Sequence, residues 1–227
     1  MPELTSRAEP QWRLSAPLVG WVAAVVVSTI SYSIATAAGA DADTVGAYFG
    51  GQIGFWGGLL GAVVLASRTW GTGNVRVDFG LQSTRRDAVV GVLAGLATQL
   101  VVLPLLYLPL WLFTDDLDLT GPSEDLFDSA GPALLLAFAV IALAPIVEEL
   151  FFRGLFLGAL LTRFGPRAAV ILSAVVFGAT HFQLLQLPGL VAAGLCFAWL
   201  RVTTGRLGSA IWAHAAFNAT TVALLYV

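Results

Sequence analysis

Seven long apolar runs constrain this chain more strongly than any other feature of its sequence. Crossing a bilayer hydrocarbon core of about 30 Å takes about 20 helical residues. Of the 227 residues, 58% are hydrophobic and 11% charged, whereas soluble domains are about 45–50% apolar and about 25% charged. The sequence therefore predicts an all-α fold, a polytopic transmembrane helix bundle of about seven spans. The expected spans are residues 17–39, 47–66, 87–113, 132–162, 167–182, 187–203 and 207–226.

Three of these runs differ from an ordinary span. The first, 17–39, is longer than the apolar region of a signal peptide, which has about 7–15 residues, so we interpret it as an uncleaved span. The fourth, 132–162, is long for one crossing and is expected to tilt, to kink at Pro145 or to project from the membrane. The fifth, 167–182, is short and is expected to end near the interface or inside the bundle.

The arginines predict how the bundle is oriented. The chain has no lysine, and with seven spans ten of its eleven arginines fall on one side of the membrane. The loops on the other side contain aspartate and glutamate but no basic residue. The positive-inside rule makes the arginine side cytoplasmic, which places the N-terminus inside and the C-terminus outside. The ten residues are Arg7, Arg13, Arg68, Arg76, Arg85, Arg86, Arg163, Arg167, Arg201 and Arg206.

Composition and small residues narrow the possibilities further. The isoelectric point near 5.2 and the absence of a basic patch give no support to nucleic-acid binding. The single cysteine, Cys196, allows neither a disulfide framework within the chain nor a thiolate metal cluster. In the second span Gly50, Gly54 and Gly58 recur every four residues, a spacing that lets another helix approach closely. We expect these glycines to pack inside the bundle, and the oligomeric state is not predicted.

Polar groups inside the predicted spans indicate a functional site. An ionisable side chain at mid-membrane costs on the order of 2.5–3.5 kcal/mol on insertion scales, so it is a candidate functional residue. Both histidines of the chain belong to this group. Its members are Glu148, Glu149, Arg153, His181, His214 and the amide of Asn218.

The spacing of the fourth span separates its three charges. Glu149 and Arg153 are four residues apart, so they share one helix face and can form an ion pair. Glu148 is rotated by about 100° from Glu149, so the two carboxylates point in different directions. The spacing predicts a structural, site-orienting pair, Glu149 with Arg153, and leaves Glu148 for chemistry.

Two further helices contribute the other polar groups at the same four-residue spacing. Phe177 and His181 share a face of the fifth span, and His214 and Asn218 share a face of the seventh. A carboxylate in such a bundle can act as a general base on water, with a histidine sharing the activation. A second histidine and an amide can donate hydrogen bonds to a developing oxyanion. The set therefore favours peptide or ester hydrolysis by an activated water.

Simpler interpretations stay open for the same residues. His181 could bond a backbone carbonyl, and Asn218 could bridge two helices. Glu148, His181 and His214 could instead ligate zinc and leave a position for water. Depth is a further constraint, because Glu148 and His181 lie about 21 Å from the arginine ends of their spans but His214 only about 10 Å. The site closes only if the seventh span starts deep in the bundle or the fourth projects from it.

These residues lie in three short motifs that resemble those of a known family. "EELFFR" (148–153) is similar to the EExxxR motif of the CAAX-protease and bacteriocin-processing family of intramembrane endopeptidases. "FGATH" (177–181) is similar to its FxxxH motif, and "HAAFN" (214–218) to its HxxxN motif. The resemblance covers about residues 132–222. It divides the chain into an N-terminal variable three-span region, 1–130, and a C-terminal four-span catalytic region, 131–227.

The resemblance implies a glutamate-dependent membrane protease whose site opens to the cytosol, with no obligatory metal or other cofactor. By motif position, Glu148 would activate water with help from His181. His214 and Asn218 would stabilise the oxyanion, and the ion pair named above would orient the site.

The resemblance also implies membrane-associated peptide or protein substrates, CAAX-like or other. The arginine-only composition, rich in Ala, Gly and Val, favours a bacterial plasma membrane, where prenylated proteins are not expected. Two alternatives stay open: a non-catalytic protein of the same fold that acts in bacteriocin immunity or as a scaffold, and a small transporter that uses Glu148 as a proton carrier.

Overall fold

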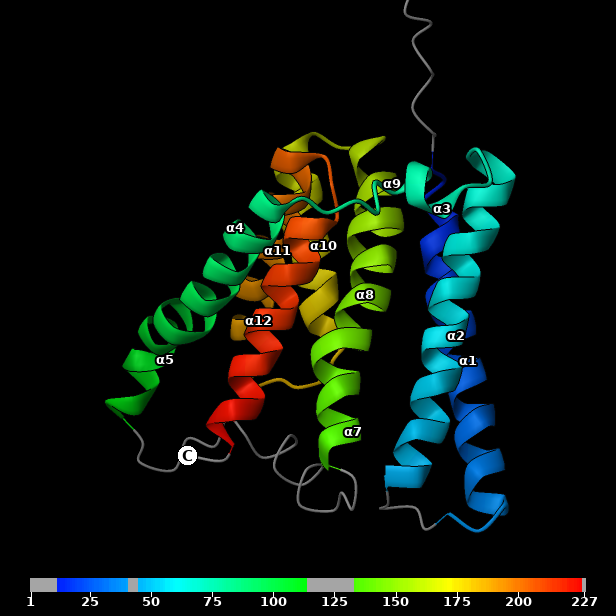
Figure 1. Cartoon of the computed structure of the whole chain (residues 1–227), viewed down its shortest axis with the longest axis horizontal. Coiled ribbons are helices and arrows are strands. Elements are labelled where there is room, and N and C mark those ends of the chain that lie inside the picture. The colour runs from blue at the N-terminus through cyan, green and yellow to red at the C-terminus, as the bar shows by residue number, and fades with distance from the viewer. Residues whose placement is uncertain (1–11, 41–44, 114–132, 226–227) are drawn as a thin grey trace, which may run out of the picture.

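A computed structural model describes residues 12–40, 45–113 and 133–225. Within these ranges the chain forms helices and no strand, which confirms the all-α prediction (Figure 1). The helices are α1 (Ser15–Ala37), α2 (Val45–Trp70), α3 (Val75–Asp78), α4 (Arg85–Ala97), α5 (Leu103–Trp111), α7 (Ala133–Phe138), α8 (Ala144–Glu149), α9 (Leu157–Leu161), α10 (Pro166–Ala179), α11 (Leu187–Thr204) and α12 (Gly208–Leu224). The π-helical segments are η1 (Thr98–Val102), η2 (Ala139–Leu143) and η3 (Leu150–Phe156).

The helices follow the order of the predicted spans. Among the described residues, five stretches are long and apolar enough to cross a bilayer: Ser15–Ala37, Gly46–Trp70, Arg85–Trp111, Leu134–Leu161 and Leu187–Thr204. The remaining two predicted spans form α10 and α12, which have 14 and 17 residues. The chain is therefore an integral membrane protein. The count of seven spans and the N-in orientation stay predictions.

The fourth predicted span is one long helix with two wide segments inside it. Widening occurs where the regular i→i−4 hydrogen-bond ladder is interrupted. η2 ends at Leu143, two residues before Pro145, where the sequence predicted a kink. η3 follows directly after the two glutamates, and all seven of its residues are buried. The irregularity expected at Pro145 thus takes the form of a π-helical segment beside the candidate site.

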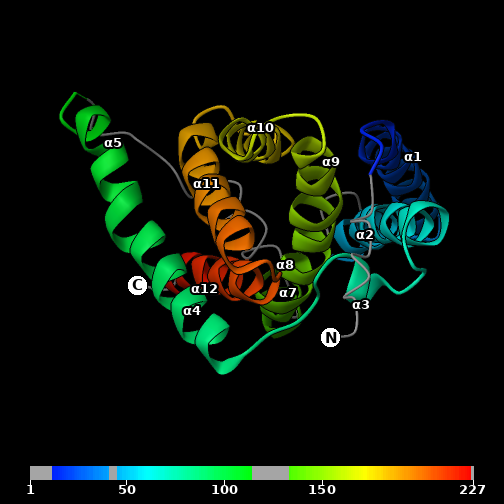
Figure 2. The same ribbon diagram turned by 90° about the horizontal axis from the view of Figure 1, so that it is seen from above.

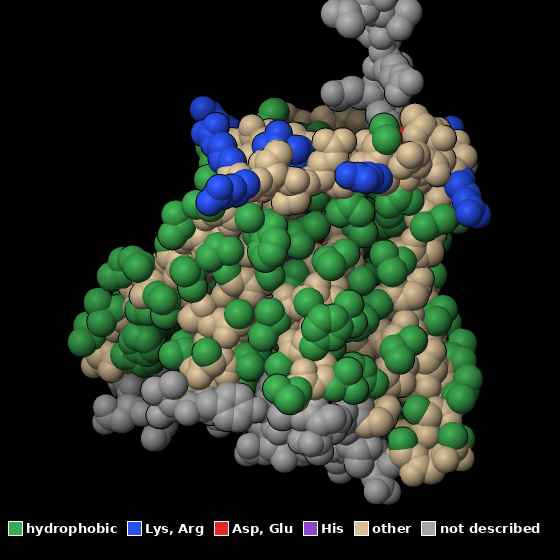
Figure 3. All heavy atoms as spheres, in the orientation of Figure 1, with side chains coloured by type: hydrophobic (Ala, Val, Ile, Leu, Met, Phe, Trp, Pro, Cys, Tyr) green, Lys and Arg blue, Asp and Glu red, His purple; other side chains and the backbone are tan. Residues whose placement is uncertain are grey.

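The described arginines, apart from buried Arg153, lie at helix ends or in the short connections between helices. Figure 3 shows arginine side chains in a layer at one end of the molecule, above a broad belt of hydrophobic side chains. We call this the arginine end and the opposite one the far end. The belt includes strongly exposed apolar side chains, such as Leu105 on α5, which is 64% exposed, as expected for a surface that faces lipid. The residues at the arginine end include Arg68, Arg76, Arg85, Arg86, Arg163, Arg167, Arg201 and Arg206.

α1 and α2 form a tightly packed pair at one side of the bundle, next to α8 and α9 (Figure 2). The repeated glycines of α2, Gly50, Gly54 and Gly58, face α1 and allow this approach. A Cβ added at Gly58 would lie 2.4 Å from the Cα of Ala24, and one added at Gly54 would lie 2.5 Å from Ser31 Oγ. The expectation that the glycine repeat packs inside the bundle is confirmed.

α12 begins beneath a loop and not at the surface. The backbone N–H of Leu207 donates to the carbonyl of Gly80, and that of Gly208 donates to the carbonyl of Gln82. Leu207 and the first residues of α12 are buried under this loop. The start of α12 is thus covered at the arginine end, and the depth of the seventh span relative to the fourth stays a prediction.

Two contacts hold α4 beside the start of α12. Arg206 donates two hydrogen bonds of 2.8 Å to the carboxylate of Asp87, which also caps α4 together with Thr84. Gly95 lets the backbones meet, because an added Cβ there would lie 2.2 Å from the carbonyl oxygen of Ala213. These contacts fix α12, and with it the histidine of the last motif.

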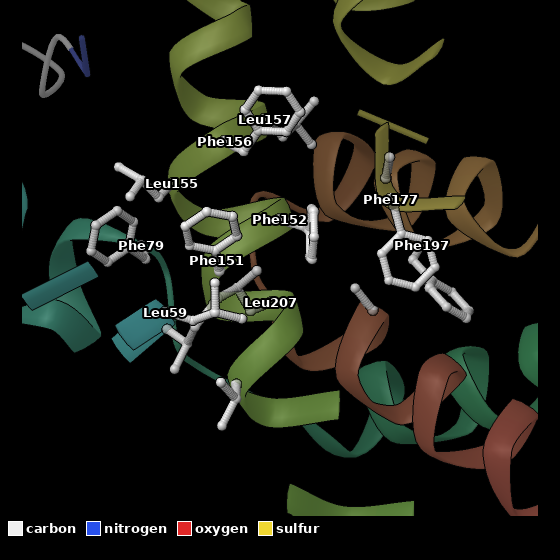
Figure 4. Packing of buried hydrophobic residues seen from close by; sticks show 14 of the residues in the cluster. Leu59, Phe79, Phe151, Phe152, Leu155, Phe156, Leu157, Phe177, Phe197 and Leu207 are labelled. Carbon is white, nitrogen blue, oxygen red and sulfur yellow. The ribbon is translucent and has the colours of Figure 1, made fainter. Parts of the chain in front are cut away.

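The hydrophobic core joins the N-terminal pair to the C-terminal helices through the aromatic residues of η3. Figure 4 shows Phe151 facing Leu59 and Phe79 on one side, and Phe152 facing Phe177 and Phe197 on the other. The Phe152 and Phe177 rings meet edge to face, with centroids 5.2 Å apart. η3 is thus held from both sides, which fixes the two glutamates that precede it.

Candidate active site

The helix that bears the two glutamates is anchored where its own ladder is broken. The N–H of Ala144 bonds the carbonyl of Ala139 across the π-helical turn. Pro145 has no N–H, so the carbonyl of Val140 loses both of its possible donors further along the helix. The side-chain amide of Asn218 on α12 donates to this carbonyl at 2.8 Å. A buried carbonyl needs such a partner, and the bond ties α12 to η2 about two turns before Glu148.

The predicted ion pair forms and is buried. Nη1 of Arg153 donates to Oε1 of Glu149 at 2.8 Å, and neither side chain is exposed to solvent. Nη2 of the same guanidinium donates to the carbonyl of Gly194 at 3.2 Å. The guanidinium also lies 4.2 Å from the centre of the Phe177 ring, in a cation–π arrangement. The pair connects η3 with α10 and α11.

His214 lies between the two carboxylates. Its Nδ1 is 2.9 Å from Oε1 of Glu149, and its Nε2 is 3.9 Å from Oε2 of Glu148. Because a carboxylate accepts hydrogen bonds, the proton on Nδ1 is the one that bonds Glu149. Glu149 therefore orients the ring and leaves Nε2 facing Glu148. The sequence predicted Glu149 as a partner of Arg153 only, and this second contact was not foreseen.

His181 follows the end of α10 and is fixed by the backbone of its own motif. Its Nδ1 lies 2.8 Å from the carbonyl of Phe177, and the two rings meet at 67° with centroids 4.8 Å apart. The carbonyl can only accept, so Nδ1 carries the proton and the neutral ring keeps its lone pair on Nε2. The chain turns sharply after it, since Phe182 has φ of +56°. The bond to a backbone carbonyl, one of the simpler interpretations, is present and leaves Nε2 for other contacts.

A cavity of about 680 Å³ brings the motif residues together. Glu148, His181, His214 and Asn218 all line it, from three separate helical elements. The orienting pair lies outside the lining, behind His214 and Phe177. The structure thus assembles the four predicted catalytic residues in one cavity; the roles assigned to them stay predictions.

The cavity also contains polar residues that the sequence analysis did not single out. Four of the six glutamines of the chain line it. They are Gln52, Gln99, Gln183 and Gln186. Two of them lie within predicted spans, where an amide is unusual, and that signal could have identified them. Tyr107 is a further polar residue in the cavity lining. Its hydroxyl donates to the carbonyl of Leu185 and accepts from the N–H of Gly189.

The geometry gives the zinc alternative no ligand set. Within residues 12–40, 45–113 and 133–225, no group of three or more His, Cys, Asp or Glu side chains lies close enough to hold a metal ion. The hydrogen bonds through Nδ1 leave Nε2 of both histidines available, as in metal-bound histidines, so the separation of the side chains decides this point. Glu148, His181 and His214 therefore do not fit a metal centre as arranged here.

Comparison with known proteins agrees with the motifs. Residues 130–220 match the family model described as type II CAAX prenyl endopeptidase Rce1-like. We call residues 130–220 the Rce1-like region after this similarity. The chain is also 34% identical over 89 residues to "Putative membrane peptidase YdiL" of Bacillus subtilis (strain 168), a match that covers 39% of this chain and 36% of that protein. No solved structure matches the chain.

The Rce1-like region coincides with the part of the chain that forms the candidate site. It includes all three motifs, the ion pair and the four cavity residues that the motifs supplied. The family resemblance inferred from the motifs is confirmed for this region. The match stops short of the N-terminal helices, and the division of the chain near residue 130 stays a prediction.

Proposed function

We propose that this chain is a membrane-embedded endopeptidase that hydrolyses peptide bonds of membrane-associated substrates with a glutamate-activated water. The observation that supports this best is the convergence of Glu148, His181, His214 and Asn218 on one cavity inside a bundle. The Rce1-like match and the relative named as a membrane peptidase favour the same reaction. Ionisable groups at this depth are otherwise costly and rare.

In the proposed reaction Glu148 takes a proton from a water molecule while Nε2 of His181 accepts a hydrogen bond from the same water. The water oxygen then bonds the carbonyl carbon of the substrate, and the carbonyl oxygen becomes an oxyanion. When the C–N bond breaks, the protonated Glu148 returns its proton to the leaving nitrogen. One carboxylate thus serves first as general base and then as general acid.

Two side chains are assigned to the oxyanion. The amide of Asn218 has two N–H donors; one bonds Val140, and the other is assigned to the substrate oxygen. His214 can donate from Nε2 only as an imidazolium, because Nδ1–H already bonds Glu149. An imidazolium there would lie between the carboxylates of Glu148 and Glu149, which compensate its charge. Glu149 and Arg153 act as positioning residues behind His214.

The proposed location is a bacterial plasma membrane with the arginine end in the cytoplasm, as the positive-inside rule predicts. The natural substrate would be a membrane-associated peptide or protein, CAAX-like or of another kind. The family resemblance implies a site that opens to the cytosol.

The test is cleavage of a fluorogenic membrane-anchored peptide library by purified protein in liposomes. Glu148→Gln and His181→Ala should each lower kcat by about 10²–10⁴-fold, the usual share of general acid–base catalysis. Thr203→Ala, an exposed position at the arginine end, is the matched control and should cleave normally. Cleavage by Glu148→Gln at the wild-type rate would refute the mechanism. A binding or resistance phenotype that survives Glu148→Gln would favour the non-catalytic alternative.

A further inference from the structure

The catalytic cavity is confined to one half of the bundle. On α12 its lining begins at His214, about 9 Å from the helix start at the arginine end, and continues to Leu225, about 26 Å away. On α11, which runs in the opposite sense, it extends from Gly189 only as far as Phe197. On α2 it includes Tyr48 and Gln52, both near the far end. Each helix therefore contributes lining residues from the half away from the arginines.

Toward the arginine end the same helices are packed closely. All seven residues of η3, which continues from the glutamates toward that end, are buried. Figure 4 shows Leu155 and Leu157 packed beyond Phe152 in this direction. On α12, Ser209 and Ala210 are fully buried under the loop that covers the helix start. A polypeptide approaching from the arginine end would meet this packed layer before it reached Glu148.

The lining chemistry suits an uncharged peptide chain. Its ionisable members among the described residues are two tyrosines and the catalytic Glu148, His181 and His214, and no arginine is among them. Side-chain amides both donate and accept, as backbone N–H and C=O groups require. Oε1 of Gln99 is buried and has no hydrogen-bond partner within the described part of the chain. It can accept from a substrate N–H once the Gln99 side chain turns toward the cavity, a change that breaks no hydrogen bond of Oε1 within the described residues.

We infer that the substrate enters this cavity from the far end of the bundle, as an extended, uncharged polypeptide segment whose backbone is met by the glutamine amides. With the arginine end in the cytoplasm, that segment belongs to the outer half of the membrane or to its outer surface. This differs from the cytosolic opening that the family resemblance implied. The inference rests on the proposed function only in treating the entering segment as a substrate. The direction of the cavity is a separate property of the fold.

The experiment is single-cysteine labelling in intact cells and in inverted membrane vesicles with a membrane-impermeant thiol reagent. Cys196→Ala first removes the one native cysteine. Gln183→Cys and Thr221→Cys place a thiol in the cavity lining. Arg167→Cys reports the arginine end, and Leu105→Cys reports a lipid-facing position on a helix that also lines the cavity.

The cavity cysteines should label at least tenfold faster in intact cells than in inverted vesicles, and Arg167→Cys should show the reverse. Leu105→Cys should stay unlabelled in both. Cavity labelling on the same side as Arg167→Cys, or on neither side, would overturn the inference. None of these readings needs peptide cleavage, so the proposed function and the entry direction can fail separately. Using two cavity positions keeps the test valid if one variant does not fold.

Discussion

The helix pair α1–α2 and the cluster of helices around the cavity are held together by different physical means. The pair depends on close backbone approach, with Gly54 and Gly58 against Ser31 and Ala24. The cluster also contains glycine contacts, but its centre is a buried charge network. In lipid the hydrophobic effect does not drive helices together. Close packing of small residues and hydrogen bonds between polar groups hold the helices together instead. The difference indicates that the N-terminal pair is built for packing, whereas the C-terminal cluster keeps costly buried charges because they form the candidate site.

The charge network should be the most sensitive part of the molecule. Arg153→Met leaves the Glu149 carboxylate buried without its guanidinium, and breaking a buried pair in this way costs about 3–5 kcal/mol. We expect that loss in unfolding experiments in detergent. The double variant Glu149→Gln/Arg153→Met should recover part of it, because no unpaired charge remains. A double variant less stable than Arg153→Met alone would contradict this account.

The helix pair should respond to a single methyl group. In Gly58→Ala the new Cβ would meet the backbone of Ala24, which cannot rotate away, and overpacking of this kind costs about 1–3 kcal/mol. Gly57→Ala is the matched control, because a Cβ there has no neighbour within 4 Å. Folded Gly58→Ala protein should keep its specific cleavage activity. Equal destabilisation by both variants would mean that the effect is not one of helix approach.

The two regions also differ in what the sequence could predict. The glycine repeat and the Glu149–Arg153 pair were predicted correctly, because both follow from the positions of residues four apart on one helix. The bond of Glu149 to His214 was not, since it joins residues 65 positions apart on different helices. The bond from Asn218 to Val140 depends on a π-helical turn that no spacing rule gives.

The cavity illustrates the same limit. The motifs identified Glu148 and His181 because charged and imidazole groups stand out in apolar runs. Gln99 stands out less, and only the three-dimensional arrangement shows that its amide lines the same space. The direction of the cavity cannot be obtained from the sequence, because it depends on which halves of the helices pack tightly.

The wall of the cavity formed by α5 and the start of α11 should show a smaller effect than the charge network or the glycine contacts. Tyr107→Phe removes the hydroxyl that bonds Leu185 and Gly189. Polar contacts between membrane helices contribute about 0.6 kcal/mol on average, so we expect a small change in global stability. The backbone N–H of Gly189 should exchange faster with deuterium, since it loses its acceptor. Unchanged exchange at Gly189 would show that the hydroxyl does not fasten this wall.

The smallest effect should come from the arginine end, where polar bonds are open to water. Asp78 accepts hydrogen bonds from Ser67, at the end of α2, and from Thr72 in the following turn. Burial alone would raise the pKa of Asp78, but the hydrogen bonds from Ser67 and Thr72 outweigh it and hold the pKa below its ordinary value.

A carboxyl with a lowered pKa in the folded state contributes stability above its ordinary pKa and loses it as the pH falls. The turn after α2 should therefore become more sensitive to an acid-active protease between about pH 6 and about pH 3. Asp78→Asn should remove this pH dependence and leave the charge network around Glu149 unaffected. If the turn were equally resistant at both pH values in the wild type, the carboxylate would contribute nothing to the stability of this turn.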